Sequence, residues 1–450
     1  LKYPGMAPWE IWISESQERM TLAVPEEKVD AFMDLMRKRE VEATVIGRFT
    51  DTGRCVVEYN GETVMDIDLE FLHDGLPKKH LQTLPVTTTY PEPKFACPDR
   101  LDNLLLAMLT RKNICSKEFI STRYDHTVQG GHVLGPVQGS GRVQASATLT
   151  KVVLDSMKGV GLSQGLFPSY TELDPYRMAI AAIDTAIRGL IAIGVPMDTI
   201  ALLDNFCWCS SDEPERLWQL KRAALGCRDG AVGFGTPYIS GKDSMYNDFS
   251  GFDADSNPVK VSVLPTLLIS SIGVHPDVTT AVSMDAKFDG DLVYVVGETG
   301  EELGGSEYLA HLGIEGGAVP SLSIETAKAR YERMTDAIEK KIVASAFPVT
   351  HGGLLVALAK VAIAGRIGID IAIPGGMCPD RYLFSESLGR FIVTVAPSDR
   401  EAFEEIFGGD AHLLGRVDGT TFRVSAGDKT LIEQPVTAME AAYKAPFGGY

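Results

Sequence analysis

The chain has 450 residues, with 42 basic and 60 acidic side chains and a formal net charge of −18. This length is enough for about two to four domains. The composition, 45% hydrophobic and 23% charged, is that of a folded protein and argues against general disorder. The negative charge argues against a nucleic-acid backbone or an anionic membrane as the main partner, although a local basic pocket for phosphate is compatible with it.

No apolar run reaches the length of about 18 residues that a transmembrane helix needs. The first residues, LKYPGMAPWEIW, lack the basic and apolar regions of a signal peptide. The seven cysteines are sparse and form no CxxC pair, which favours reduced thiols, a cytoplasmic protein and no structural zinc site. Cys207 and Cys209 would share one face of a strand, where buried packing is the simplest role, with metal binding as the alternative.

Predicted helices and strands alternate along the chain, which favours mixed α/β domains. Helical patterns cover residues 102–110, 175–194, 213–226, 324–345 and 354–364. Strand patterns cover residues 118–122, 145–154, 200–204, 261–274 and 292–296.

An internal repeat is the most informative feature of the sequence. ISESQERM at residues 13–20 and FSESLGRF at 384–391 are each followed by an apolar run, a proline and an acidic amphipathic helix pattern. Both copies then continue into a Gly-Arg strand, at residues 47–48 and 415–416. The two copies lie about 370 residues apart, and a match of motif, helix and strands in this order indicates a duplicated domain.

The two copies differ in what precedes them. The second has about a hundred residues of its own domain upstream, whereas the first has few, so we expect the chain to start inside a domain, as a fragment or cleavage product would. Residues 84–98 are rich in proline and threonine and are typical of a linker. The predicted organisation is a partial domain at 1–82, a linker at 83–98, and domains at 99–280 and 285–450.

Two segments follow predicted strands and carry polar groups suited to a phosphate ligand. In Ser240-Gly241-Lys242-Asp243-Ser244, the glycine allows close backbone approach, the lysine supplies charge and the carboxylate suits Mg²⁺. The alternative is a turn with a solvated Lys-Asp pair. Asp204-Asn205 ends a buried strand, where α/β folds bind ligands, or else it caps the next helix.

Three further segments have both a functional and a structural interpretation. Glu15-Ser16-Gln17 offers an acceptor, a hydroxyl and an amide for a polar substrate, or it is a solvated strand edge. Asp125-His126 suits acid–base chemistry, or the aspartate orients the histidine in a turn. His351 opens a helix that could expose N–H groups to an anion, although the helix itself is ordinary core.

As an ordered set, ISESQERM, YDHTVQ, LLDNF, SGKDSMYND and GGLLVALA resemble the synthetase subunit of phosphoribosylformylglycinamidine synthase (FGAM synthase). The resemblance covers essentially the whole chain and is to the second half of that subunit. It implies an α/β, tandem-duplicated fold like that of aminoimidazole ribonucleotide synthetase. Here one full ATP-binding-type and C-terminal-type pair would follow a partial C-terminal-type domain.

The resemblance also implies an activity. The family amidates formylglycinamide ribonucleotide, using ATP, Mg²⁺ and glutamine-derived ammonia. A glutaminase subunit or region, possibly with a small bridging subunit, would supply the ammonia. The missing N-terminal half of the synthetase would be a further partner, because the family's histidine base and most of its Mg²⁺ ligands resemble residues of that half. His126 and His351 are not equivalents of that base, so no catalytic residue is assigned.

Site residues carry over by motif. The resemblance implies that Glu15, Ser16, Gln17 and Ser244 bind substrate, and that Asp204, Gly241 and Lys242 bind ATP.

Lys242 departs from the family's asparagine, a metal ligand. Because an ammonium group cannot bind a metal, Asp243 becomes the candidate for Mg²⁺.

An auxiliary nucleotide site of the family would fall on Lys117 and Ile120, but its acidic metal ligands are replaced. The replacing residues are Gln144, Thr185, Gly189 and His351. Without carboxylates a Mg–nucleotide complex should bind poorly, so we predict that this site is degenerate.

Two alternatives stay open. One is a catalytically incomplete half that only binds partners. The other is a different enzyme of the superfamily, such as aminoimidazole ribonucleotide or selenophosphate synthetase, although those are single-copy chains and the repeat argues against them.

Overall fold

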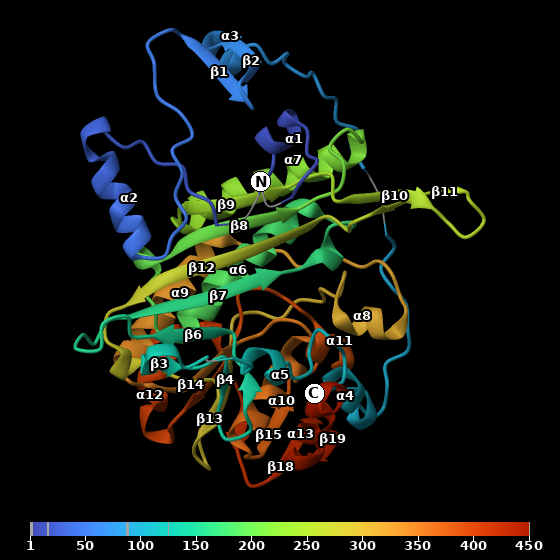
Figure 1. Cartoon of the computed structure of the whole chain (residues 1–450). Helices are drawn as coiled ribbons and strands as arrows, with labels where there is room; N and C mark the ends of the chain where they lie inside the picture. Colours follow the sequence, from blue (N-terminus) through green and yellow to red (C-terminus); the bar gives the residue numbers. More distant parts are fainter. Residues whose placement is uncertain (1–2, 16–17, 87–89, 125, 450) are drawn as a thin grey trace. The chain divides into compact units, whose positions relative to one another are not determined.

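The computed structural model describes residues 3–15, 18–86, 90–124 and 126–449 (Figure 1). The chain divides into two units, Leu1–His80 and Leu81–Tyr450. Among the described residues, none of the helices has both the length and the apolar character needed to cross a membrane.

The described part of the first unit has little regular structure and contains no buried core. Its helices are α1 (Pro8–Trp12), α2 (Val29–Lys38) and α3 (Leu69–Asp74), and its one hairpin joins β1 (Arg54–Tyr59) to β2 (Glu62–Asp68). None of its described residues is buried. The amphipathic helix of the first repeat copy is confirmed, but residues 47–48 do not form the predicted strand. A strand needs neighbours to pair with, and the described part of this unit offers only the hairpin.

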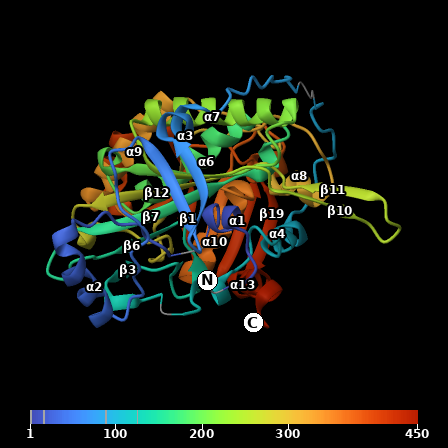
Figure 2. The same cartoon turned by 45° about the horizontal axis from the view of Figure 1, so that its top comes forward.

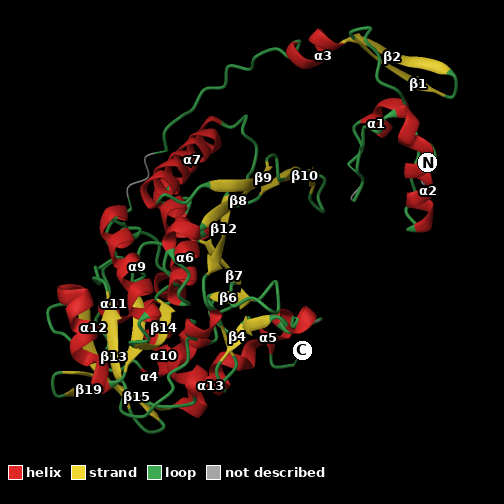
Figure 3. Cartoon of the chain, turned by 90° about the vertical axis from the view of Figure 1, so that its left-hand side faces the viewer, coloured by secondary structure: helices red, strands yellow, loops and turns green. Residues whose placement is uncertain are grey.

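The second unit contains a six-stranded sheet in the order β3-β6-β7-β12-β8-β9. Its strands are β3 (His132–Leu134), β6 (Ala147–Thr150), β7 (Gly159–Leu166), β8 (Ala201–Cys207), β9 (Tyr238–Ser244) and β12 (Thr266–His275). The helices α6 (Pro175–Ala192) and α7 (Pro214–Phe234) lie side by side and cover one face (Figures 2 and 3). The side chains of β7 and β12 alternate between buried and more exposed, so within this unit the other face is uncovered.

Helix α6 is the centre of this region. Asp174 caps it by accepting hydrogen bonds from the backbone N–H groups of Tyr176 and Arg177, and Pro175 occupies its first turn. Almost all of its residues are buried; most of them are apolar, and Asp184 and Arg188 are the charged exceptions. Gly189 lets it approach β7, because a Cβ there would lie 2.1 Å from Ser163 Oγ.

A seven-stranded sheet forms the C-terminal region, in the order β14-β16-β13-β17-β15-β18-β19. Its strands are β13 (Leu292–Val296), β14 (Val343–Pro348), β15 (Ile369–Ile373), β16 (Phe391–Val395), β17 (Ala411–Val417), β18 (Thr421–Ala426) and β19 (Lys429–Pro435). Helices cover both faces, so β16 is buried along its whole length. These helices are α4 (Asp102–Leu109), α9 (Ile324–Glu339), α10 (Gly353–Gly365), α12 (Arg400–Phe407) and α13 (Val436–Lys444).

The two sheets share one continuous core. Side chains of α6 and α7 pack in the same cluster as Tyr294, Tyr331 and Phe391 of the C-terminal region. Helix α4, which lies within the predicted domain 99–280, packs instead on α10 and α13. A division of the second unit between residues 280 and 285 therefore stays a prediction.

The remaining elements are short. They are α5 (Glu118–Ser121), α8 (Glu307–Leu312), α11 (Pro379–Phe384), the β4–β5 pair (Val137–Gln138 and Val143–Gln144) and the hairpin of β10 (Asp248–Phe252) and β11 (Pro258–Ser262). Figure 1 shows this hairpin projecting from the sheet.

Several predicted elements need correction. Residues 118–122 form the helix α5 rather than a strand. The helix predicted at 324–345 ends at Glu339, and β14 begins at Val343. Lys341 has a φ of 60°, a left-handed conformation that no glycine or proline announces in the sequence. The strand predicted at 145–154 is confirmed only as the shorter β6, and the one predicted at 261–274 is divided between the end of β11 and β12.

The expectation of reduced cysteines is also wrong at one pair. Cys97 and Cys378 form a disulfide with a Cα–Cα distance of 6.1 Å. A separation of 281 residues leaves no local sequence signal for this pairing. Cys209 is buried and unbonded, and Cys207 is half-buried at the end of β8, in agreement with a packing role.

Candidate functional site

The two segments predicted to bind phosphate lie on neighbouring strands. Asp204 is in β8 and the SGKDS segment is in β9, at the edge of the six-stranded sheet. The strands run parallel, with Asp204 opposite Gly241 and Asn205 opposite Lys242. The structure therefore brings together residues that the sequence separates by almost forty positions.

Asp204 lies directly over Gly241. A Cβ on Gly241 would lie 2.1 Å from Asp204 Oδ1, so only glycine leaves room for this carboxylate. Burial, followed by the charge of Asp243, raises the pKa of Asp204. The side chains of Asp204 and Asp243 lie on the same face of the sheet. Strand alternation and the β8–β9 register place both on the face of buried Leu202 and Phe206, which is the face that the helices cover.

Lys242 and Ser244 point to the opposite, uncovered face. Lys242 Nζ donates a 2.8 Å hydrogen bond to Ser244 Oγ, and Asn247 Nδ2 donates to the Ser244 carbonyl oxygen at 2.8 Å. Asn205, opposite Lys242 in the register, shares this face and is exposed. The predicted residues of β8 and β9 therefore lie on opposite faces of the sheet. Asp204 and Asp243 are on the helix-covered face, and Lys242, Ser244 and Asn205 are on the uncovered face.

The predicted substrate residues of the first copy are only partly visible. Glu15 is exposed in the first unit, and Ser16 and Gln17 lie outside the described residues. Asp125 is also outside them, and the ring of exposed His126 lies 6.0 Å from that of His132.

The second copy of the motif has a structural role that the sequence analysis missed. Ser385, Glu386 and Ser387 are all buried. The Glu386 carboxylate accepts hydrogen bonds from Gly352 N at 2.7 Å, Glu307 N at 3.0 Å and the Tyr170 hydroxyl at 3.0 Å. Burial raises its pKa. The internal repeat could have pointed to this role, because it places Glu386 just before the buried strand β16.

A buried ion pair reinforces this region. Asp184 and Arg188, one turn apart on α6, have no exposed surface, and their charged groups are 2.8 Å apart. Tyr331 donates a hydrogen bond to Asp184, and Arg188 donates to the carbonyl oxygens of Val349 at 2.6 Å and Arg390 at 3.0 Å. This pair thereby joins the two sheets.

Three of the predicted auxiliary-site residues lie near α5. Burial lowers the pKa of Lys117, whose Nζ donates to the Cys115 carbonyl oxygen at 3.3 Å. Burial, and then the charge of Lys117, lowers the pKa of Lys360 to about 8. Ile120 is 61% exposed, and the Gln144 amide exchanges hydrogen bonds with Ser121 Oγ at 2.9 and 3.1 Å.

The other predicted auxiliary-site residues, Thr185, Gly189 and His351, make contacts within the protein. Thr185 accepts a hydrogen bond from Arg188 at 3.2 Å, and Gly189 is the close contact of α6 with β7. His351 contacts the Leu166 carbonyl oxygen at 3.1 Å and lies 4.6 Å from the Phe167 ring. None of these positions supplies a carboxylate, and degeneracy of this site stays a prediction.

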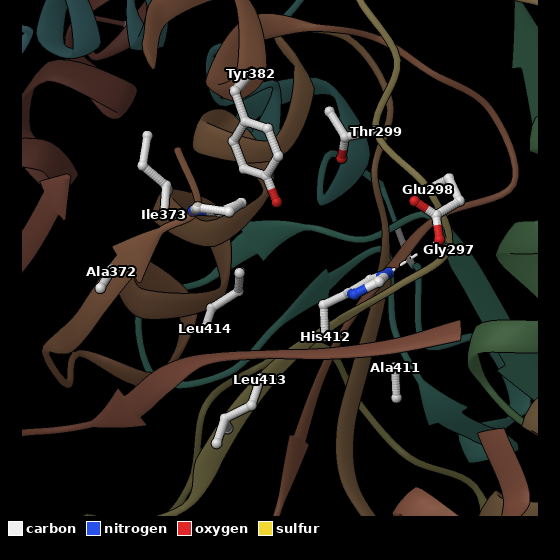
Figure 4. Close-up of a pocket in the computed structure, with 11 residues that line it drawn as sticks. Gly297, Glu298, Thr299, Ala372, Ile373, Tyr382, Ala411, His412, Leu413 and Leu414 are labelled. Atoms are coloured by element: carbon white, nitrogen blue, oxygen red, sulfur yellow. Dashed lines mark hydrogen bonds and ion pairs between the residues drawn. The ribbon is translucent and has the colours of Figure 1, made fainter. Parts of the chain in front are cut away.

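A hollow of about 670 Å³ lies in the C-terminal region, at the ends of β13, β15 and β17 (Figure 4). Tyr382 and Thr299 present hydroxyl groups to it, and Glu298 pairs with His412 at 3.2 Å. Buried Arg390 donates to Thr299 Oγ1 at 2.7 Å. No residue predicted from the sequence lies here.

Comparison with known families gives two matched ranges. The model described as "AIR synthase related protein, C-terminal domain" matches residues 1–60 and 289–426. These ranges contain the two copies of the internal repeat, which confirms the duplication.

The chain is also similar in sequence to named proteins over nearly its whole length. Phosphoribosylformylglycinamidine synthase subunit PurL of Thermococcus sibiricus is 33% identical over 98% of this chain and 59% of its own length. The subunit of Methanocaldococcus jannaschii is 32% identical, with the same coverage, and that of Streptomyces coelicolor 31%, over 100% of this chain and 58% of its own. The chain thus spans about three fifths of these curated relatives.

Solved structures of Thermotoga maritima PurL show the same fold. One, complexed with FGAR, has a TM-score of 0.55 and 19% identity, covering 75% of this chain and 53% of its own. Another, described as PurLQS, has a TM-score of 0.54 and 18% identity, covering 78% and 52%. A third, complexed with ATP, has a TM-score of 0.50 and 18% identity, covering 76% and 55%. Over nearly its whole length the chain is therefore similar to the PurL subunit of FGAM synthase, and two of its segments match the C-terminal domain of AIR synthase-related proteins.

Proposed function

We propose that this chain is part of an ATP-dependent ligase that converts formylglycinamide ribonucleotide and glutamine-derived ammonia into formylglycinamidine ribonucleotide. The observation that carries the proposal is the register of β8 and β9, which sets Asp204 against Gly241. Both residues belong to motifs of a family to which the chain is similar along 98% of its length. ATP would activate the amide oxygen as a leaving group, and ammonia would displace it.

The acidic face of the strand pair suits a metal-bound phosphate. Asp204 and Asp243 point the same way, and carboxylate oxygens are the ligands that Mg²⁺ prefers. In this proposal Asp204 and Gly241 contact ATP and Asp243 holds Mg²⁺.

The open face suits phosphate or substrate. Lys242 supplies a cation for a phosphate group. The hydroxyl of Ser244, which accepts a hydrogen bond from Lys242, is proposed to contact the substrate. Glu15, Ser16 and Gln17 of the first repeat copy are also proposed to bind the substrate.

The uncovered sheet face is the proposed contact of a companion domain. Leu162, Leu166 and Val274 point outward from it and are 52%, 39% and 42% exposed. An apolar sheet face of this kind normally packs against a second layer. We propose that the N-terminal half of the full synthetase supplies that layer, together with the catalytic base.

Ammonia is proposed to reach this ligase from a glutaminase, with a small bridging subunit as a further partner. The description of a similar solved structure as PurLQS supports an assembly of this kind. Formylglycinamide ribonucleotide as substrate is supported by the FGAR complex of a similar protein.

ADP release tests the proposal directly. The chain is incubated with ATP, Mg²⁺ and ammonium salt, with and without formylglycinamide ribonucleotide, and with and without the N-terminal half of a PurL relative. Substrate-dependent ADP release only when both halves are present is the expected result. Release by the chain alone would show that the base and metal ligands are here instead.

Equilibrium dialysis with ATP separates the ligase from a half that only binds partners. The reconstituted protein should bind ATP in the micromolar to millimolar range, and Asp204→Asn should weaken that binding. Equal binding by both proteins would favour the non-catalytic alternative. Tightly bound Mg–ADP beside Lys117 would refute degeneracy of the auxiliary site.

A further inference from the structure

The segment that follows the first unit lies against the C-terminal region without forming a helix or strand. The carbonyl oxygen of Pro91 and the Tyr90 side chain lie close to Gly316, and Pro93 lies close to Gly317. Further on, the Phe95 ring meets Tyr308 edge-on, with centroids 5.7 Å apart. These contacts are local and few, so they hold the segment weakly.

One covalent bond strengthens this attachment. Cys97, at the end of the segment, is bonded to Cys378, the residue that precedes α11. Arg381 of α11 lies over the Phe95 ring at 5.1 Å, so ring, cation and disulfide gather on one short stretch. Cys97 is an exposed residue, whereas Cys378 is half-buried and Asp380 is buried.

The other cysteines offer no such pair. Among the described residues Cys115, Cys209 and Cys227 are free and buried, and Cys55 and Cys207 are free and half-buried. Exposure and a nearby second sulfur are two properties that favour reversible oxidation of a cysteine. Only the pair Cys97 and Cys378 combines them in the part of the chain that the structure describes.

We propose that Cys97 and Cys378 are a reversible redox modification site that fastens residues 90–98 to the C-terminal region. With a peroxide as oxidant, the Cys97 sulfur becomes a sulfenic acid and releases water. The Cys378 sulfur then displaces the second water as the S–S bond forms, so two thiols and one peroxide give a disulfide and two waters. A dithiol reductant returns both thiols by exchange at exposed Cys97 and is itself oxidised to a disulfide.

A metal site at the same place is the competing interpretation. Asp380 Oδ1 lies 3.8 Å from Cys97 Sγ, and the ligand atoms of the three residues lie within 4.8 Å of one another. A structural zinc normally takes four protein ligands, and the structure gathers three. Asp380 also accepts a hydrogen bond from the Tyr308 hydroxyl at 2.7 Å, which accounts for its burial without a metal.

The state of the pair sets how much of the connecting segment is free. With the disulfide closed, the connection is fixed at Cys97. With it open, the first backbone anchor after the segment is the hydrogen bond from Leu101 N to the Leu431 carbonyl oxygen. Residues 90–98 are then held by non-covalent contacts such as those of Pro91, Pro93 and Phe95.

Limited proteolysis of the full chain tests the proposal. Lys94 is exposed, and trypsin cleavage after it requires the segment to leave the surface. Cleavage should be about tenfold faster after reduction with dithiothreitol, and Cys378→Ser should show the fast rate under both conditions. Cys55→Ser, the control, should respond to reduction like the unmodified chain.

Peptide mapping under non-reducing conditions completes the test. Peroxide treatment of the reduced chain should produce the Cys97–Cys378 cross-linked peptide, and dithiothreitol should remove it. One equivalent of zinc in the reduced protein, with both thiols protected from peroxide, would overturn the proposal in favour of a metal site. Equal cleavage rates at Lys94 in both states would overturn the fastening role.

Discussion

Replacing Glu386 tests whether the second copy of the repeat motif is structural. In Glu386→Ala the donors Gly352 N, Glu307 N and the Tyr170 hydroxyl lose their shared acceptor. Each buried donor left without a partner costs about 1–3 kcal/mol. Removing the buried carboxylate also removes its desolvation cost, so we expect a net loss of about 3–5 kcal/mol in the free energy of unfolding.

Glu386→Gln is the matched variant. Its amide oxygen keeps the bonds from Gly352 and Glu307, and its NH₂ group can donate to the Tyr170 hydroxyl in place of the lost acceptor. We expect a loss of about 1 kcal/mol or less. Glu405→Gln, on the exposed side of α12, should stay within about 0.5 kcal/mol of the unmodified chain.

Urea unfolding followed by circular dichroism measures these differences, provided that the urea dependence of the free energy is unchanged. If Glu386→Ala is no less stable than Glu386→Gln, the hydrogen bonds to this carboxylate do not hold the region together and the reasoning fails.

The pH dependence of stability gives a second test, in which the unmodified chain is compared with Glu386→Gln. Burial raises the folded-state pKa of Glu386, so between its ordinary pKa and the raised value the folded chain binds a proton that the unfolded chain does not. The contribution of this group to stability therefore falls as pH rises through that window and is constant above it. Relative to Glu386→Gln, the unmodified chain should lose stability as pH rises from about 4. A difference independent of pH would contradict the assignment.

Three further predictions concern other parts of the second unit. Gly241→Ala should displace the Asp204 carboxylate and weaken ATP binding by the reconstituted protein by about tenfold or more, measured by dialysis, whereas Gly375→Ala, with open space around it, should not. Asp184→Ala should lower the free energy of unfolding by about 3–5 kcal/mol, because it leaves Arg188 buried without its partner; a loss below about 1 kcal/mol in urea would contradict this. Leu162→Asp, on the uncovered sheet face, should leave the chain's melting temperature nearly unchanged but abolish co-elution with the N-terminal half.

Long elements with a clear apolar pattern were predictable from the sequence. The pattern of α6 and the strand predicted at 200–204 correspond to elements in the structure, because burial on a helix or strand leaves a periodic trace. The strand does not end at Asp204-Asn205 as predicted, since β8 continues through them to Cys207. The strand prediction at 118–122 is wrong because α5, with four residues, is too short to show a helical period. The helix predicted to reach Ser345 overran because its left-handed stop is a lysine.

The candidate site was predictable as a set of motifs but not as an arrangement. Nothing local shows that Gly241 lies under Asp204, since that follows from parallel pairing of two strands with a whole helix between them. Nor does the sequence show that Lys242 and Asp243 face opposite sides until the segment is known to be a strand rather than a turn. The disulfide is the extreme case, because its two residues meet only through the complete fold.

The two repeat copies show why the same motif carries different roles. Around Glu386 the fold supplies two backbone N–H groups and a tyrosine hydroxyl, so the buried carboxylate accepts three hydrogen bonds within the protein. Glu15, in the same motif, is exposed in a unit whose described residues include no buried core. A buried carboxylate that already accepts three hydrogen bonds is out of reach of a substrate, whereas an exposed one is accessible. If a polar triplet of this kind binds substrate, it is the copy around Glu15, and the copy around Glu386 is the part of the duplication that became core.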